Sequence, residues 1–443
     1  MRASALLIVF AICSQAAAAN ERPNILLIMA DDVGCDAIGC YGGQSYKTPR
    51  IDALAKGGTR YRYCYSMPVC HPTRVCLLTG RYPFKLGHPR WGSFPRKAER
   101  QTFARSLKRS GYTTAIAGKW QIAMLGKDLK HPNRLGFDQY CLFGWHEGPR
   151  YFQPLIWQNG KRRANVKDQY GPTAYCDFLI KFFEQNRDRP FMAFYSMALC
   201  HDVTDDLKKP VPFGPNGRYE TFKEMMENMD RHVGMLVDAL DRLKLRKKTL
   251  ILFTCDNGTA KRSILTAKDK TYTRVPVFSI RNGVRVQGGK GNLSDDGTNV
   301  PLIANWPGRV PAGKVRDDLV DVSDFYPTMA ELGKADVPAK PSIDGRSFAA
   351  SLFGGASKRK WAFAEGRGKY WVRTQKWKLY KNGRLFDVGS DPRERSFVTM
   401  DTEASAQARE FLTGVSKQLK WRKKTVRRNK RKRSSANDKK TPL

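Results

Sequence analysis

The chain has 443 residues, of which 41% are apolar, and its 79 lysine and arginine residues exceed the 41 acidic residues, giving a formal net charge of +38. The length and apolar content predict one large α/β domain and a smaller second domain in the same chain. No apolar run after the N-terminus is long enough to span a membrane. The charge favours anionic partners, but no helix-turn-helix, zinc-finger or RNP-type pattern accompanies it, which argues against nucleic acid.

Residues 1–19 are typical of a secretory signal peptide. Arg2 precedes an apolar run from Ala5 to Ile12, and small residues continue to Ala19. The run is too short to cross a bilayer, so we expect a secreted or periplasmic protein without a transmembrane segment. Export permits disulfides, but the ten cysteines show no spacing that identifies a pair.

Several short apolar runs, which we interpret as buried strands, end at or shortly before residues that can do chemistry. The runs and the polar residues that follow them are 24–30 with Asp31 and Asp32, 113–117 with Lys119, 191–197 with His201, and 250–255 with Asp256 and Asn257.

Helical segments at 51–56, 174–184 and 222–243 alternate with these strands. The alternation predicts a three-layer α/β/α domain with a large, mostly parallel central sheet. Ligands of such sheets bind outside the carboxyl ends of the strands, so the four strand ends predict a single cleft.

The two pairs Asp31 with Asp32 and Asp256 with Asn257 predict a cation site. A single Asp at a strand end is usually a turn or helix-capping residue. Three carboxylates and an amide oxygen gathered in one place repel one another unless a hard cation lies between them, and oxygen ligands suit Ca²⁺ or Mg²⁺. The ligand spacings of a zinc site are absent from the sequence.

Residues 70–81, CHPTRVCLLTGR, predict a helix whose first turn contains Pro72 and whose end is Gly80. Cys70 would then lie at the helix N-terminus, where free N–H groups and the dipole favour an anion such as sulfate. Arg74 can reach back over one turn toward it. An unmodified Cys70 there would have a lowered pKa and act as a thiolate, which is the alternative chemistry.

A proline-rich segment, DVPAKPSIDG, interrupts the alternation of strands and helices and predicts a domain boundary. We expect the large domain over 21–334 and, over 335–416, a smaller α+β subdomain with an antiparallel sheet and a packed helix. Residues 417–443 carry a net charge of +12 and few apolar residues, which predicts a disordered basic tail. It is either a solvated tail or an electrostatic attachment to an anionic surface. Without this tail and Arg2, the body retains +25.

The chain resembles the type I formylglycine-dependent sulfatases, of the alkaline phosphatase superfamily fold, from Pro23 to about Val398. Residues 70–74 fit the C-x-P-x-R signature, in which the cysteine becomes formylglycine, and LLTGRYP follows it. NILLIMADDVG, GYTTAIAGKW, TCDNG, GGKGN and VPLIANWPG resemble further family segments, and KWKLY with GRLFDVGSDPRE resembles the C-terminal subdomain.

The resemblance implies that Ca²⁺ is bound by Asp31, Asp32, Asp256 and Asn257, with the modified Cys70 also touching the metal. Arg74 and Lys119 would orient the formylglycine hydrate, while His201 and Lys290 would bind the sulfate ester and assist the leaving oxygen. In the family's scheme one hydroxyl of the hydrate attacks sulfur, and a base then deprotonates the other so that sulfate leaves. A formylglycine-generating enzyme is an implied partner.

Two positions depart from the family's pattern. Gln121 follows Gly-Lys-Trp where the family commonly has the histidine that takes this proton, and glutamine cannot accept a proton near neutral pH. Loss of a positioned base typically costs about 10² to 10⁴ in rate, unless another group, such as a water held by Gln121 or His146, takes over. His201 lacks the prolines of the family's P-H-x-P, and a buried structural histidine is its alternative role.

We therefore predict an exported sulfatase acting on sulfated carbohydrate, since the basic body favours polyanionic substrates over small aryl sulfates. The alternatives are a slow or inactive sulfatase-like protein that binds anionic polysaccharide, and a phosphoryl or phosphonate hydrolase on the same fold.

Overall fold

The computed structural model describes residues 22–144, 147–201, 221–268 and 271–421. The predicted signal peptide, His146 and residues 422–443 of the predicted tail lie outside the described residues. Within the described ranges, no helix is long and apolar enough to cross a membrane. The nine cysteines that the structure describes are all free thiols, and eight of them are buried.

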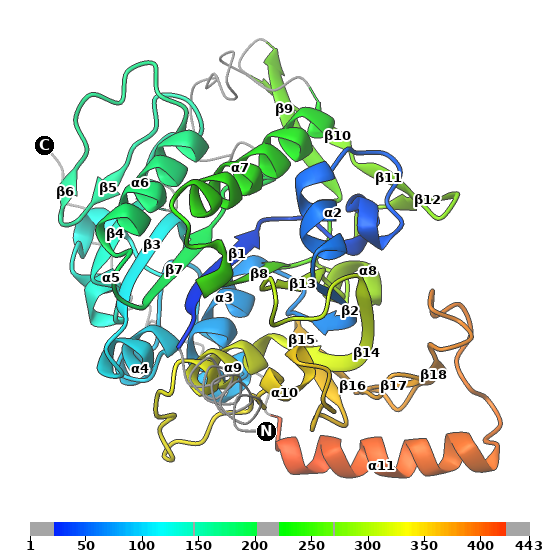
Figure 1. Ribbon diagram of the computed structural model, residues 1–443. Helices are drawn as coiled ribbons and strands as arrows, with labels where there is room; N and C mark the ends of the chain where they lie inside the picture. The colour runs from blue at the N-terminus through cyan, green and yellow to red at the C-terminus, as the bar shows by residue number, and fades with distance from the viewer. Residues whose placement is uncertain (1–21, 145–146, 202–220, 269–270, 422–443) are drawn as a thin grey trace, which may run out of the picture.

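A ten-stranded mixed sheet forms the centre of the large domain (Figure 1). Five neighbouring strands, β8, β1, β7, β3 and β4, run parallel, and antiparallel neighbours extend the sheet on both sides. In spatial order the strands are β14 (Lys314–Asp321), β2 (Thr59–Tyr65), β13 (Leu302–Asn305), β8 (Thr249–Cys255), β1 (Asn24–Ala30), β7 (Phe191–Ser196), β3 (Thr113–Trp120), β4 (Gln139–Gly144), β5 (Trp157–Gln158) and β6 (Lys161–Arg162).

Strand β1 is the centre of the core because all seven of its residues are buried. Its register places Ala30 opposite Cys255 of β8 and Met29 opposite Ser196 of β7. Near-continuous apolar strands are typical of parallel sheets covered on both faces. The register therefore brings the residues after β1, β7 and β8 to one edge of the sheet.

Helices cover both faces of the sheet, as predicted (Figure 1). One group packs together on one face, namely α2 (Pro49–Lys56), α6 (Gly171–Gln185) and α7 (Phe222–Arg242). The other group comprises α3 (Cys70–Thr79), α4 (Phe103–Arg109) and α9 (Phe325–Leu332). Shorter helices are α5 (His131–Arg134), α8 (Asp295–Thr298) and α10 (Ala349–Leu352), and two hairpins pair β9 (Arg262–Lys268) with β10 (Thr271–Pro276) and β11 (Phe278–Arg281) with β12 (Val284–Gln287).

The C-terminal part is a four-stranded antiparallel sheet with a helix packed on it, which confirms the predicted fold class. The strands are β15 (Ala362–Gly366), β16 (Lys369–Arg373), β17 (Trp377–Tyr380) and β18 (Leu385–Asp387), and α11 (Glu403–Leu419) lies against β16 and β17 (Figure 1). Because α11 continues to Leu419, residues 417–419 are helical, and the prediction that the disordered tail begins at 417 is wrong at these residues. Leu419 and Val415 of this helix are buried against the sheet, and that burial extends the helix.

Candidate active site

Cys70 occupies the first position of α3, as the sequence predicts. The helix ends at Gly80, whose φ of 64° is left-handed and costs glycine nothing. Thr73 donates its hydroxyl to the carbonyl oxygens of Met67 and Val69, which fixes the chain that enters the helix. Cys70 is completely buried, and its position places the free N–H groups of the helix beside its side chain.

Burial raises the pKa of the Cys70 thiol, and the nearby cations Lys119 and Lys290 only partly oppose this effect. The expectation that an unmodified Cys70 has a lowered pKa is therefore wrong. The helix N-terminus alone does not offset complete desolvation of a thiolate, so this geometry does not favour the thiolate chemistry.

Asp31 and Asp32 follow β1 directly and point into the same site. The backbone of Asp32 is left-handed, with φ of 61°, a conformation that Asp tolerates better than most residues. Asp31 is tied to the segment after β7, because its N–H donates to the carbonyl of Leu199 at 2.8 Å and its carbonyl accepts from the N–H of Cys200 at 2.6 Å. The turn after β1 is thus held by the neighbouring strand's connection.

Three cations neutralise the carboxylates, of which Arg74 and Lys119 are buried and Lys290 is partly buried. Lys119 Nζ lies 2.5 Å from Asp31 Oδ2, and Lys290 Nζ lies 2.6 Å from Asp32 Oδ2. Arg74 donates to Asp256 Oδ2 through NH2 at 2.6 Å and Nε at 3.0 Å. Isolated charges are very costly to bury, so these pairs allow the cluster to exist inside the protein.

The protonation equilibria of the carboxylates reflect this arrangement. Burial alone would raise the pKa of Asp31, but Lys119, His201 and Arg74 outweigh it and hold the pKa below its usual range. For Asp256, burial and the neighbouring charge of Asp31 dominate and raise the pKa. For Lys290, burial is outweighed by Asp32, which raises the lysine pKa and keeps it charged.

The remaining predicted residues also converge here. Asn257 Nδ2 donates to Asp32 Oδ1 at 2.8 Å, and His201 Nε2 lies 3.8 Å from Asp32 Oδ2. Gln121 Nε2 approaches Cys70 Sγ at 3.7 Å. The structure therefore brings every sequence-predicted site residue into one cluster, in which all but the partly buried Lys290 are buried: Asp31, Asp32, Cys70, Arg74, Lys119, Gln121, His201, Asp256, Asn257 and Lys290.

Several acceptors in this cluster have no hydrogen-bond partner among the described residues. They are Asp31 Oδ1, Asn257 Oδ1 and Gln121 Oε1, all buried. Buried polar atoms are normally hydrogen-bonded, and an unsatisfied one indicates a missing ion, water or substrate. Single ligand atoms of Asp31, Cys70 and Asp256 lie within 4.8 Å of one another, and so do those of Asp32, Cys70 and His201. The donor set therefore fits a hard cation.

Sequence reasoning missed Ser196, the last residue of β7. Its hydroxyl accepts from Arg74 NH1 and donates to the carbonyl of Lys119 at 2.8 Å, so it links two site residues. Gly118 permits this contact, because its φ is 99° and a Cβ there would lie 2.0 Å from the Ser196 carbonyl oxygen. A serine at a strand end is too common to indicate this role, but the glycine before Lys119 marks a close strand approach.

The loop that follows α3 was also missed. Gly92 donates its N–H to the carbonyl of Gln121 at 3.1 Å, and His71 Nε2 lies 2.9 Å from the carbonyl oxygen of Ser93. These bonds fasten the loop beside Cys70. Their partners are distant in sequence, so no local pattern could have indicated them.

Next to this loop a pocket of about 490 Å³ opens beside the two residues that follow Cys70. The pocket extends to the β15–β16 turn, where Arg367 lies within 3.6 Å of the position that a Cβ on Gly291 would occupy. Its lining comprises Val69, His71, Pro72, Pro83, His88, Pro89, Arg90, Trp91, Glu365, Gly366, Arg367 and Gly368. Both the large domain and the C-terminal sheet therefore contribute to the surroundings of the site.

Comparison with known proteins gives a consistent result. The Sulfatase family model matches residues 23–335. N-acetylgalactosamine-6-sulfatase of Canis lupus familiaris is 28% identical, and the alignment covers 87% of this chain and 79% of the relative. Steryl-sulfatase of Mus musculus is 30% identical over 78% of this chain and 67% of the relative.

A solved structure supports the same assignment. The crystal structure of Ps i-CgsB in complex with k-i-k-neocarrahexaose is similar with a TM-score of 0.72 and 26% identity, covering 90% of this chain and 93% of that chain. Since the family model spans most of the chain, and the cluster around Cys70 supplies the polar groups that a sulfate ester requires, this chain belongs to the sulfatase family and is a sulfuric ester hydrolase.

Proposed function

We propose that this protein hydrolyses sulfate esters of anionic carbohydrate through a formylglycine made from Cys70, with Ca²⁺ as its metal. One observation carries the proposal: Cys70 lies at the N-terminus of α3 inside a largely buried cluster of three carboxylates and three cations, whose oxygen acceptors are not all satisfied by the described residues.

Asp31, Asp32, Asp256 and Asn257 would hold the Ca²⁺. The unsatisfied Asp31 Oδ1 and Asn257 Oδ1 support this, because both are oxygen donors of the kind that Ca²⁺ prefers. When bound, the ion supplies positive charge that stabilises the developing charge on a sulfuryl group. The chain's own three cations balance its three carboxylates, so a bound Ca²⁺ would leave the site positive and suited to a substrate that is itself an anion.

Formylglycine at position 70 would supply a hydroxyl nucleophile for attack on sulfur. The free N–H groups of α3 and the side chains of Lys119 and Lys290 would bind the anionic oxygens of the sulfate group. Arg74 donates to Asp256 and Ser196, so we assign it the positioning of these groups as well as charge stabilisation.

His201 and Lys290 both lie against Asp32 and are placed to bind the ester and assist its leaving oxygen. Gln121 contacts Cys70 through its amide nitrogen, and its buried Oε1 is left as an acceptor. We infer that Gln121 holds a water there and that this water, or a more distant base, takes the proton that the family's histidine would take. Glutamine itself cannot take it.

The pocket beside Cys70 supports an anionic carbohydrate as substrate. Arg90 and Arg367 are in its lining, and Trp91, which is half exposed, offers an aromatic surface. Sugar rings carry both apolar faces and polar edges, so a pocket with an aromatic ring and guanidinium groups suits a sugar that bears more than one anionic group. The complex of the structurally similar Ps i-CgsB with k-i-k-neocarrahexaose is consistent with a carbohydrate substrate.

We further propose that residues 1–19 direct export, which makes the protein secreted or periplasmic, and that a formylglycine-generating enzyme modifies Cys70. The basic residues of the tail would attach the protein to anionic surfaces. These assignments rest on the sequence pattern.

Matched substrates test the proposal. Sulfate and phosphate monoesters of the same alcohol, and a panel of sulfated oligosaccharides, are assayed with protein made in the native host. We expect release of sulfate to exceed release of phosphate and to be fastest with a sulfated sugar. Faster release of phosphate would contradict the proposal in favour of a phosphoryl hydrolase, and tight binding without release would favour an anionic-polysaccharide binder.

A further inference from the structure

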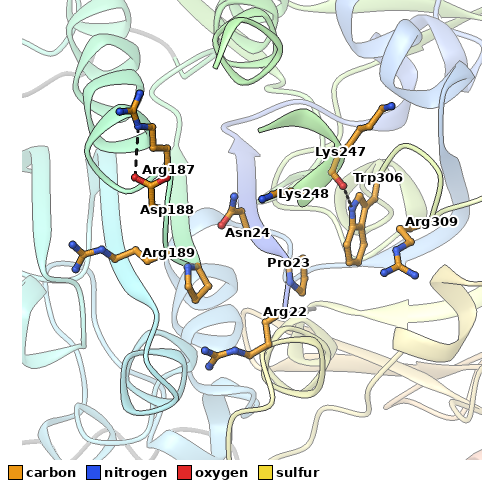
Figure 2. Close-up of a pocket in the computed structure, with 11 residues that line it drawn as sticks. Arg22, Pro23, Asn24, Arg187, Asp188, Arg189, Lys247, Lys248, Trp306 and Arg309 are labelled. Carbon is orange, nitrogen blue, oxygen red and sulfur yellow. Dashed lines mark hydrogen bonds and ion pairs between the residues drawn. The ribbon is translucent and has the colours of Figure 1, made fainter. Parts of the chain in front are cut away.

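A second pocket, remote from Cys70, lies at the opposite edge of the central sheet. It is bounded by the residues that precede β1, β7 and β8, together with the segment after β13 (Figure 2). The catalytic residues follow the carboxyl ends of β1 and β8, so the length of these strands, about 20 Å at ~3.3 Å per residue, separates the two sites. No step of the proposed reaction uses this pocket.

The pocket is strongly basic and has a volume of about 500 Å³, a size that accepts small ligands. Six lysine or arginine residues and a single acidic residue are in its lining (Figure 2): Arg22, Arg187, Arg189, Lys247, Lys248, Arg309 and Asp188. Such an excess of one charge around a concave surface concentrates ions of the opposite sign.

Some of these cations are held in place by aromatic rings. Arg22 lies 5.6 Å from the centre of the Tyr112 ring and donates to the carbonyl of Ser110, while Arg309 lies 5.6 Å from the centre of the Trp306 ring. Preorganised guanidinium groups lose little conformational freedom when an anion binds. This arrangement favours binding over a merely solvated surface.

Other cations of the pocket form no ion pair within the part of the chain that the structure describes. Among the described residues, no carboxylate pairs with Arg189, Lys247 or Lys248, and Asp188 is paired with Arg187 at 3.6 Å. Asn24 adds a neutral donor, because its Oδ1 accepts from the N–H of Phe191 and its amide nitrogen has no acceptor in the described part of the chain. The pocket thus offers several donors and almost no competing acceptor.

We propose that this pocket binds anionic groups of a sulfated polysaccharide as a second, non-catalytic holding site. The saccharide is chosen because the proposed substrate is an anionic carbohydrate, and one polymer can contact both edges of the sheet; to this extent the inference rests on the proposed function. Holding a polymer at a second point raises its effective concentration at the catalytic site.

Lysine footprinting of the full-length protein tests the proposal residue by residue. Lysines are acetylated with and without a short dextran sulfate, and the modification of each is read by mass spectrometry. We expect Lys247 and Lys248 to be protected at least threefold, whereas Lys360 and Lys376, which are exposed just before β15 and β17 of the C-terminal part, serve as controls. Hydrolysis of a small sulfate ester by the same preparation reports the catalytic site separately, so failure of the proposed function and failure of this inference are distinguishable.

Two further arms use neutral dextran and a single-stranded DNA of equal charge. Protection by dextran sulfate and not by neutral dextran supports the proposal. Unchanged reactivity of Lys247 and Lys248 with dextran sulfate overturns it, and so does stronger protection by DNA, which would assign the pocket to nucleic acid.

A matched pair of double variants gives the second measurement. Lys247→Gln with Lys248→Gln is expected to raise KM for a sulfated polymer by about two- to thirtyfold, the range for two lost surface ion pairs, and to leave hydrolysis of a small sulfate ester unchanged. Lys360→Gln with Lys376→Gln removes the same charge in the C-terminal part and should change neither. An equal rise in KM for the polymer in both double variants would mean that only the net charge of the protein matters, and it would overturn the proposal.

Discussion

Two clusters of buried charge in this protein have the same balance of sign but differ in how their polar atoms are satisfied. The catalytic cluster consists of Asp31, Asp32, Asp256, Arg74, Lys119 and Lys290. The junction cluster consists of Asp295, Glu394, Arg373 and Lys378, and it connects α8 to the C-terminal sheet. Each contains as many carboxylates as cations.

In the junction cluster the charges are fully hydrogen-bonded. Arg373 NH1 donates to both oxygens of Asp295 at 2.8 Å, and Lys378 Nζ donates to Asp295 at 3.1 Å and to Glu394 at 2.6 Å. The remaining donors reach backbone carbonyls, including those of Leu293 and Thr374. Such a network stabilises one arrangement of the two parts.

The catalytic cluster keeps acceptors without partners, namely Asp31 Oδ1 and the neighbouring Asn257 Oδ1 and Gln121 Oε1. Charge balance alone therefore does not identify a functional site in this protein. In the catalytic cluster the balanced charges are accompanied by unsatisfied acceptors, which are costly unless a ligand binds them. Five tests would break or sharpen this distinction.

The largest expected effect is on chemistry. Cys70→Ala should reduce sulfate release by about 10⁶-fold, the scale seen when a nucleophile is removed, while the protein stays folded. Cys76→Ala, on the same helix and equally buried, is the control and should keep its activity. Activity assays with melting curves check both, and an active Cys70→Ala protein would contradict the assignment of the nucleophile.

Removal of the metal should come next. Chelation should abolish most activity, and added Ca²⁺ should stabilise the wild type by about 2.7 kcal/mol at a hundredfold excess over its Kd. Asp256→Asn should lose this stabilisation because it removes a charged ligand, whereas Asp295→Asn should retain it. The melting temperature of each variant is measured with and without Ca²⁺. An equal rise on adding Ca²⁺ in both variants would mean that the ion binds elsewhere.

Breaking the junction cluster should affect stability and not chemistry. Asp295→Asn is expected to lower the free energy of unfolding by about 3 kcal/mol, because it leaves Arg373 and Lys378 buried without their partner, and to leave kcat unchanged. Denaturant titration measures this change. Asp401→Asn, which removes an exposed pair with Arg409, should leave unfolding unchanged.

The same carboxylate predicts an acid limit. Burial opposes ionisation, but Arg373 and Lys378 outweigh it and lower the pKa of Asp295 from 3.8 to about 2. A lowered folded-state pKa contributes stability that is complete above about pH 4 and is lost as pH falls toward 2. Wild type should lose this contribution over that window, and Asp295→Asn should lack it. The free energy of unfolding is measured against pH for both proteins. If it falls equally in both between pH 4 and pH 2, Asp295 is not the cause.

The smallest expected effect concerns Gln121. We expect Gln121→His to change steady-state turnover by less than tenfold, because in our account another group already takes the proton. Rapid-mixing kinetics of the wild type should show no burst. A burst of one equivalent followed by almost no turnover, with rescue by Gln121→His, would show that the missing base limits this protein.

Much of the catalytic cluster could be predicted because its residues follow strands that are apolar throughout. The parallel strand β1 and its neighbour β8 place Asp31 and Asp256 side by side, since the carboxyl ends of parallel strands share an edge. The predicted helix beginning at Cys70 and ending at Gly80 was also confirmed. Its signals are local, because proline favours the first turn of a helix and glycine its end.

Contacts that depend on distant side chains could not be predicted. Ser196 lies between Arg74 and Lys119, and Asp295 pairs with Arg373, 78 residues away. The strands β2 and β14 also escaped prediction because both mix polar with apolar residues, and the pairing of β13 with β2 and β8 leaves no local signal. The pocket at the opposite edge forms only when four separate segments meet.

Mass spectrometry of the tryptic peptide that spans residues 63–74, from protein made in its native host, tests the central claim most directly. The peptide contains both Cys64 and Cys70, so Cys64 serves as an internal control for alkylation. Our account predicts a loss of about 18 mass units located at Cys70 by fragmentation, with Cys64 alkylated normally. Two alkylated cysteines in most molecules would contradict it, because the proposed reaction would then lack its nucleophile.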